Sequence, residues 1–249
     1  MNNKTAIEWS DSTWNPTTGC TKISPACANC YIERQTPFRI AGRRFVKGDI
    51  PIQLHMNRLD QPKHWRTPRR IFVDSMSDLF HVDVPGHFIL DVYRTMGAAF
   101  WHTYQVLTKR PKRLVEIWPQ LTYRMHAEGR THLSEWRHVW HGVSVENKAS
   151  LWRIDELRKV PCAVRFLSVE PMLSDLDAID LSGISWVIAG GESGPRVRPS
   201  NPDWFRSLRD QCVTAGIPFL FKQWGGRTPK SGGRLLDGRT WDEFPEARS

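Results

Sequence analysis

The stretch WVIAGGESG, residues 186–194, joins an apolar run to a polar, glycine-rich end. Its first four residues have the length and β-branched content of a strand that is buried on both faces. The glycines and Glu192 follow directly, where a buried strand meets a turn or a ligand. The same succession of an apolar run and a polar end recurs along the chain, and it predicts the fold.

Five further runs share this pattern, at residues 71–73, 104–107, 139–143, 164–167 and 218–221. Helical signals lie between the runs, near residues 86–99, 111–118, 148–159 and 202–215. Strands that alternate with helices predict βαβ units and a parallel sheet. We therefore expect an α/β fold, a partial or complete parallel (β/α) barrel that forms a single domain over residues 1–249.

Each predicted strand ends in polar or reactive residues, and in a parallel barrel these ends share the face that carries the chemistry. They are Asp74–Asp78, Thr108-Lys109-Arg110, Ser144–Asn147, Ser168-Val169-Glu170-Pro171, Gly190–Gly194 and Lys222–Gly226. One such end would be an ordinary cap or turn, whereas six together favour an active-site rim.

Within this rim, cationic side chains suit a carboxylate or a phosphate, and hydroxyls and carboxylates suit ribose or substrate. We assign catalytic roles to Lys109, Glu146, Glu170 and Lys222. Cofactor binding is assigned to Ser144, Ser168, Gly190, Gly191 and Glu192, because glycines admit a ligand to the backbone and a carboxylate can bind an ammonium group. The alternative for each is a strand-end cap, a tight turn or an ion pair.

The second feature is a cysteine loop, TGCTKISPACANCY, residues 18–31. It places Cys20, Cys27 and Cys30 within eleven residues. Three readings remain open: an iron–sulfur cluster with three thiolate ligands and one free iron, a structural zinc that needs a fourth ligand, or unligated thiols. No second CxxC pair offers the fourth zinc ligand, which favours the cluster. Cys162 and Cys212 lie in apolar surroundings and are read as packing residues.

Charge and composition narrow the class of protein. Lysine and arginine outnumber aspartate and glutamate 35 to 26. This excess suits a polyanionic partner such as nucleic acid, and a merely basic soluble surface is the equal alternative. No apolar run has the length of a membrane span. The polar N-terminal residues lack a secretory signal, so a cytoplasmic location is expected, where thiols stay reduced.

Two segments fall outside the strand–helix pattern. Residues 43–68 are rich in proline and arginine and are expected to form an irregular insertion or lid over the site. Residues 225–249 are expected to form a C-terminal extension, in which Asp237-Gly238 between short runs predicts a hairpin.

The cysteine loop ahead of a βα series resembles the radical S-adenosylmethionine (SAM) superfamily. More closely, the chain resembles a phage-borne family of unknown function with a three-cysteine motif. The matching segments are Trp14-Asn15-Pro16, Gly19-Cys20, Cys27-x2-Cys30-Tyr31, Asp78-Leu79-Phe80, Leu107–Arg110, Gly142–Glu146, Ser168–Pro171, Gly190–Gly194 and Phe221–Gly225. The first cysteine gap is six residues here and three in the common superfamily motif, and Asn29 stands where an aromatic residue often precedes the last cysteine.

This resemblance implies a barrel of radical-SAM type, with a [4Fe–4S] cluster on Cys20, Cys27 and Cys30 and SAM on the open iron. It also implies an external electron donor, a 5′-deoxyadenosyl radical that takes a hydrogen atom from substrate, and a phage-infected or prophage-bearing bacterial host. Together with the positive charge, it suggests modification or repair of a base in nucleic acid or a nucleotide. Two alternatives stay open: a metal-stabilised module that binds nucleic acid without catalysis, and a hydrolase that uses the acidic strand ends.

Overall fold

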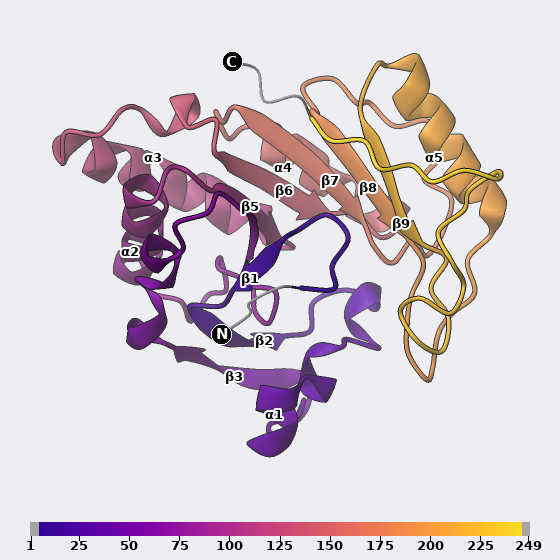
Figure 1. Cartoon of the computed structure of the whole chain (residues 1–249), viewed down its shortest axis with the longest axis horizontal. Helices are drawn as coiled ribbons and strands as arrows, with labels where there is room; N and C mark the ends of the chain where they lie inside the picture. The colour runs from indigo at the N-terminus through magenta and orange to yellow at the C-terminus, as the bar shows by residue number, and fades with distance from the viewer. Residues whose placement is uncertain (1–4, 246–249) are drawn as a thin grey trace.

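The computed structural model describes residues 5–245. Its main sheet has seven strands in the order β1-β4-β5-β6-β7-β8-β9, and every neighbouring pair is parallel. The strands are β1 (Ser12–Trp14), β4 (Arg70–Val73), β5 (Thr103–Thr108), β6 (Val139–Ser144), β7 (Val164–Val169), β8 (Trp186–Gly190) and β9 (Phe219–Gln223). The sheet is curved (Figure 1) and its edge strands β1 and β9 do not pair with each other, so the predicted α/β barrel is confirmed in its partial form.

Four helices cover the outer side of this sheet (Figure 1). They are α2 (Gly86–Ala98), α3 (Pro111–Ala127), α4 (Trp152–Arg158) and α5 (Pro202–Thr214). Their apolar side chains join alternate strand residues in the largest hydrophobic core. The sequence predicted that α3 would end at 118, before Pro119, but buried Leu121 and Met125 continue its apolar stripe and carry the helix past the proline. The predicted helix 148–159 is a 3-10 turn, Lys148–Ser150, followed by α4.

The inner side of the sheet is filled toward the amino ends of the strands. A second core cluster there contains Trp9, Phe72, Trp140, Phe166, Trp186, Ile188 and Leu220. The fit is close at Gly142, where a Cβ would lie 2.4 Å from the Phe166 ring. This end is packed mainly with aromatic side chains, and its buried polar groups Ser10 and Gln105 are hydrogen-bonded to each other at 2.7 Å.

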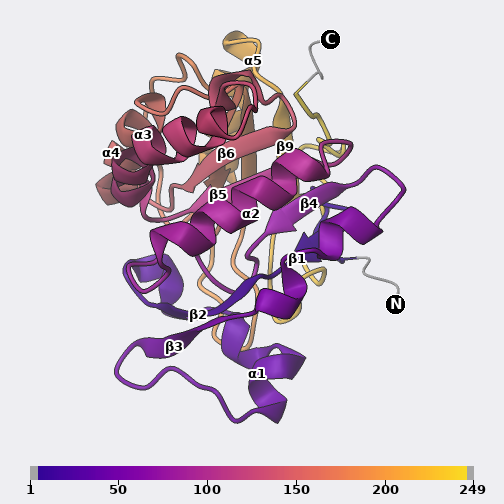
Figure 2. The same ribbon diagram turned by 90° about the vertical axis from the view of Figure 1, so that its left-hand side faces the viewer.

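A separate two-stranded antiparallel sheet crosses the carboxyl ends of the main strands (Figure 2). It pairs β2 (Thr17–Thr21) with β3 (Asp49–Leu54). The short helix α1 (Thr36–Ile40) belongs to the segment of chain that connects the two strands. The segment 43–68 is therefore only partly irregular, because β3 and two 3-10 turns, Met56–Arg58 and Gln61–His64, lie within it. Ile50 anchors β3 in a small third core with Ile32 and Phe38.

The C-terminal segment lies along the free edge of β9. Asp237 and Gly238 both have positive φ, 53° and 80°, and the flanking Leu236 and Arg239 form an antiparallel bridge. The predicted Asp-Gly turn is thus present, although it pairs only one residue on each side. The Phe221 amide donates to the Trp241 carbonyl, which ties the segment to β9. Residues 246–249 of the predicted extension lie outside the described residues.

Candidate functional site

The cysteine loop lies over the rim formed by the carboxyl ends of the parallel strands. Strand β1 leads through Asn15-Pro16 directly into β2, which carries Cys20. The Gly19 amide donates to the Met76 carbonyl at 3.1 Å, and the Ser77 hydroxyl donates to the Gly19 carbonyl at 2.8 Å. Gly19 has φ +105°, and a Cβ there would lie 2.3 Å from the Pro51 carbonyl oxygen. Only glycine permits this close approach of β2 to β3 and the rim.

Cys20 lies beside an ion pair from two strand ends. The Arg110 guanidinium is 2.9 Å from Asp78 and 3.8 Å from the Cys20 sulfur. The same guanidinium donates to the Thr21 carbonyl at 3.0 Å, so Arg110 joins β2 to the end of β5. Burial and the Asp78 charge raise the pKa of the Cys20 thiol to about 12, against the opposing effect of Arg110.

Cys27 is connected to the end of β6 through Ser24. The Ser24 hydroxyl lies 3.6 Å from the Cys27 sulfur and donates to the Glu146 carboxylate at 2.7 Å. Glu146 is fully buried and is paired with Arg153 of α4 at 2.8 Å and with Lys109 at 3.5 Å. Burial opposes ionisation of Cys27, but the Lys109 charge and hydrogen bonds outweigh it and hold its pKa below 9.0.

The third contact with the rim is made beside Cys30, at Asn29. Its side-chain amide donates to the Glu192 carboxylate at 3.1 Å and to the Arg196 carbonyl at 2.8 Å. Glu192 also forms an ion pair with Arg198 at 2.6 Å and accepts the Arg198 backbone amide at 2.8 Å. The Glu192 oxygens that we expected to bind a ligand ammonium thus already accept hydrogen bonds from the protein.

The three sulfurs share one neighbourhood. None is in a disulfide, and all three side chains are partly buried. Burial is the main cause that raises the pKa of Cys20 and of Cys30. The charge of Cys30 further raises the pKa of Cys20, and the charge of Cys27 further raises the pKa of Cys30. Among residues 5–245, however, no three His, Cys, Asp or Glu side chains converge closely enough to hold a metal ion. The donor set has the right type and number for a three-thiolate site, and its side chains are not in a closed ligand geometry.

A second group of predicted residues lies at the ends of β6, β7, β8 and β9. Lys222 and Glu170 form an ion pair at 3.3 Å, both largely buried. The other Glu170 oxygen, Oε1, is buried without a hydrogen-bond partner, and a Cβ on Gly190 would lie 2.9 Å from it. Ser144 and Ser168 are directly paired in register on neighbouring strands. These residues form one inner surface of the rim, as the alternation along the strands predicts.

The neighbouring glycine has a structural explanation. A Cβ on Gly191 would lie 2.0 Å from the Trp224 carbonyl oxygen, and the Gly191 amide donates to the Gln223 carbonyl. The loops after β8 and β9 pack against each other at this point. Close backbone packing alone therefore requires glycine at 191.

Asp74 ends β4 and holds the start of β2. Its carboxylate accepts the Thr17 amide at 3.0 Å and the Thr17 hydroxyl at 2.9 Å. Burial raises its pKa from 3.8 to about 7, although the Thr17 hydrogen bonds act in the opposite direction. The sequence placed Asp74 at the rim, and the structure shows it underneath the cysteine loop.

Asp74 gives a pH prediction for stability. Its pKa is higher in the folded protein, so the native state keeps a proton that the unfolded chain releases between about pH 4 and 7. This contribution is present below about pH 4 and is lost as the pH rises to about 7, by at most about 4 kcal/mol. We expect the free energy of unfolding of wild type, measured with urea, to fall relative to that of Asp74→Asn as the pH rises from about 4 to about 7. A constant difference between the two proteins would contradict the assignment.

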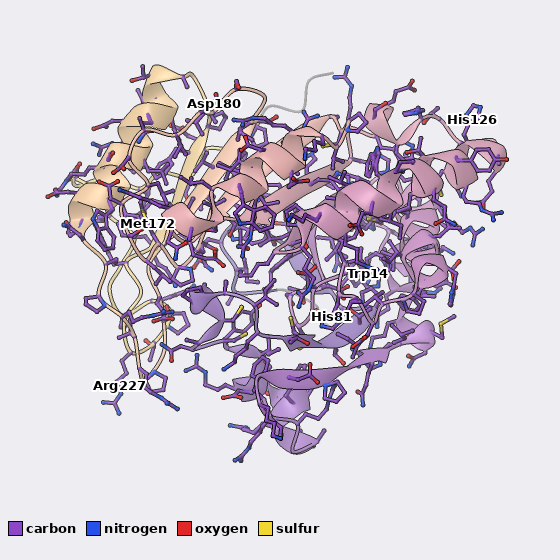
Figure 3. All side chains as sticks on the ribbon, turned by 180° about the vertical axis from the view of Figure 1, so that it is seen from behind. Trp14, His81, His126, Met172, Asp180 and Arg227 are labelled. Carbon is purple, nitrogen blue, oxygen red and sulfur yellow. The ribbon has the colours of Figure 1, made fainter. Side chains whose placement is uncertain are left out.

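Several residues that shape the site were not predicted. Ser24, Asn29 and Arg198 are polar loop residues without a distinguishing pattern. Arg153 did carry a signal: it lies four residues before Leu157 on the buried face of α4, and a cation there needs a buried carboxylate. Figure 3 shows His81 between the main sheet and the β2–β3 sheet, where it is 2.8 Å from the Thr21 hydroxyl.

The fold and site define a parallel α/β half-barrel with a three-cysteine loop over its rim. The family model described as "Protein of unknown function (DUF5131)" matches residues 4–245, so the chain belongs to this family. No curated protein matches the sequence. None of the described helices has the length and apolar character required to cross a bilayer.

Solved structures of spore photoproduct lyase are similar to this chain. A cysteine-to-serine mutant of the lyase aligns at 13% identity with a TM-score of 0.47, covering 81% of this chain and 61% of the lyase. A double mutant of the lyase with bound AdoMet and dinucleoside spore photoproduct aligns at 16% identity with a TM-score of 0.44, over the same shares of the two chains. The chain thus spans about three fifths of the length of these lyases.

Proposed function

We propose that the protein is an iron–sulfur enzyme of radical-SAM type that acts on nucleic acid or a nucleotide. The observation that carries this proposal is the position of the cysteine loop. Its three partly buried thiols lie over the carboxyl ends of a parallel half-barrel, and the loop is hydrogen-bonded to the ends of β4, β5, β6 and β8. In a parallel barrel this face carries the chemistry.

Cys20, Cys27 and Cys30 would hold a [4Fe–4S] cluster, with one iron left for SAM. When bound, the cluster would pass one electron from an external donor to SAM, and this would supply radical chemistry: SAM would be cleaved to methionine and a 5′-deoxyadenosyl radical able to take a hydrogen atom from substrate. Lys109 near Cys27 favours the thiolate form that a metal requires, and Arg110 acts in the same direction on Cys20, where burial and Asp78 oppose it. The aromatic cluster at the opposite end of the half-barrel closes that end to water.

The protein's own residues divide into two groups in this proposal. Glu146 and Glu192, whose oxygens are engaged by Ser24, Arg153, Asn29 and Arg198, hold the cysteine loop in place. Glu170 and Lys222, with Ser144, Ser168 and Gly190, form the surface that would bind SAM or substrate. The free Glu170 Oε1 can accept a hydrogen bond from a ligand N–H or O–H group.

The test is an electron paramagnetic resonance spectrum of the anaerobically reconstituted, dithionite-reduced protein, with and without SAM. We expect stoichiometric iron and sulfide and a cluster signal that SAM perturbs. A colourless protein that holds stoichiometric zinc and binds nucleic acid regardless of SAM would overturn the proposal in favour of a metal-stabilised binding module.

A further inference from the structure

The charge of the molecule is concentrated beside the cysteine loop. Residues 22–47 contain six basic side chains and one acidic side chain, in a protein whose total net charge is +9. We define the basic arm as residues 34–47, which leave the cysteine loop, form α1 and return toward β3. The arm and the β2–β3 sheet protrude from the carboxyl ends of the main sheet (Figures 1 and 2). This segment alone therefore carries a net charge of +5, six basic side chains less one acidic side chain.

The cations of the arm are exposed and free of acidic partners. Arg39, Arg44 and Lys47 are all exposed, and no ion pair within residues 5–245 includes them. Arg94, Arg158 and Arg206, which lie on the outer helices, are each paired with two carboxylates. A surface that neutralises its arginines on the helices and leaves them unpaired on the arm is suited to an external polyanion.

The arm is held rigidly enough to present these charges. Arg43 donates to the Thr18 hydroxyl at 2.9 Å and to the Gln53 side chain at 2.8 Å, and its guanidinium stacks on Phe38. The Phe45 amide donates to Glu33 at 3.3 Å. Arg43 and Glu33 are thus used to fix the arm, and Arg39, Arg44 and Lys47 remain exposed.

Arg196 and Arg227, which form no ion pair within residues 5–245, continue this surface. Arg34 packs against Gly194, where a Cβ would lie 2.4 Å from its guanidinium, and Gly194 donates to the Gly226 carbonyl. The loops after β8 and β9 therefore adjoin the arm, and they carry the exposed Arg196 and Arg227. Figure 3 shows Arg227 at the outer end of its loop, on the side of the molecule where the β2–β3 sheet lies. Basic residues from separate elements thus surround the rim.

We propose that the basic arm, together with Arg196 and Arg227, binds the phosphate backbone of a nucleic acid strand that crosses the rim. This inference rests on the proposed function and adds the surface that positions the substrate. The exposed Ile40 and Val46, at 80% and 71% exposure, lie among the same cations and offer apolar contact to sugars and bases. An anionic membrane could also attract such a surface, but α1 has only five residues and buries Phe38, so it lacks an amphipathic face for a bilayer.

The experiment measures DNA binding by fluorescence anisotropy over a range of salt concentrations, with the full, anaerobically reconstituted chain and short labelled single-stranded and duplex DNA. The arm variant carries Arg39→Gln, Arg44→Gln and Lys47→Gln. The control variant carries Arg124→Gln, Lys159→Gln and Arg206→Gln, on or next to the outer helices, which lowers the net charge equally. We expect the arm variant to bind at least about tenfold more weakly and to lose about 2 to 3 from the slope of log K against log salt.

The outcomes separate this inference from the proposed function. Equal binding by the arm variant and the control would overturn the inference and leave the enzyme proposal intact. If wild type bound anionic phosphatidylserine vesicles but not DNA, and the arm variant lost the vesicle binding, the partner of the arm would be a membrane and the inference would be overturned. Failure to bind either would remove the arm's function and the nucleic-acid substrate together, while the cluster is judged separately by its spectrum.

Discussion

Cys20→Ala, Cys27→Ala and Cys30→Ala are each expected to abolish the iron–sulfur cluster of the reconstituted protein. Three thiolates are the whole protein contribution to a cluster with one open iron, so removal of one leaves only two corners held. Iron and sulfide analysis, with the absorbance of the cluster, measures the loss. Reductive cleavage of SAM should disappear with the cluster in all three variants.

The matched control for this series is Cys162→Ala, which removes a free thiol just before β7 and not from the rim. We expect it to keep the wild-type iron content, with a modest loss of stability from the buried position. A cysteine variant of the loop that retains full cluster content would contradict the ligand assignment at that position. Equal losses in the control would show that iron content merely follows folding.

Glu146→Gln is expected to lower the free energy of unfolding by about 3–5 kcal/mol, because it leaves Arg153 buried without a charged partner. Glu146 has no solvent exposure, and Lys109 and Ser24 depend on the same carboxylate. Denaturation in urea, followed by tryptophan fluorescence, measures the change. The loss should be partly recovered when Arg153→Met is added, since the double variant no longer contains the unpaired cation.

Glu156→Gln, on the helix α4 that also carries Arg153, provides the comparison. Glu156 pairs with Lys159 at 2.7 Å at the surface, and an exposed pair of this kind contributes only about 0.3–0.5 kcal/mol. If Glu146→Gln cost no more than Glu156→Gln, the buried carboxylate would not be the anchor of the cysteine loop. A large loss at 146 alone would support the anchoring role of the Ser24–Glu146–Arg153 chain.

Part of the fold was predictable because strands and helices leave a local pattern of apolar and polar residues in the sequence. The run 186–189 is apolar on both faces and ends at polar residues, and the structure places strand β8 there. The run 164–167 is apolar except for Arg165, and it lies in β7. Strand β3 was not predicted, because Pro51 interrupts its backbone donors and its neighbours are rich in arginine. It forms because Ile50 enters a core with Ile32 and Phe38, a long-range contact that no local pattern contains.

The candidate site divides in the same way. The cysteine spacing, the six polar strand ends and the parallel sheet that gathers those ends at one face could be predicted from the sequence, because covalent order and side-chain alternation fix them. The partners of each group became visible only in the folded structure: Arg110 beside Cys20, Ser24 and Glu146 beside Cys27, and Arg198 on Glu192. Hydrogen bonds and ion pairs between distant segments depend on angstrom-scale packing of helices, strands and loops, and the sequence carries no short-range record of that packing.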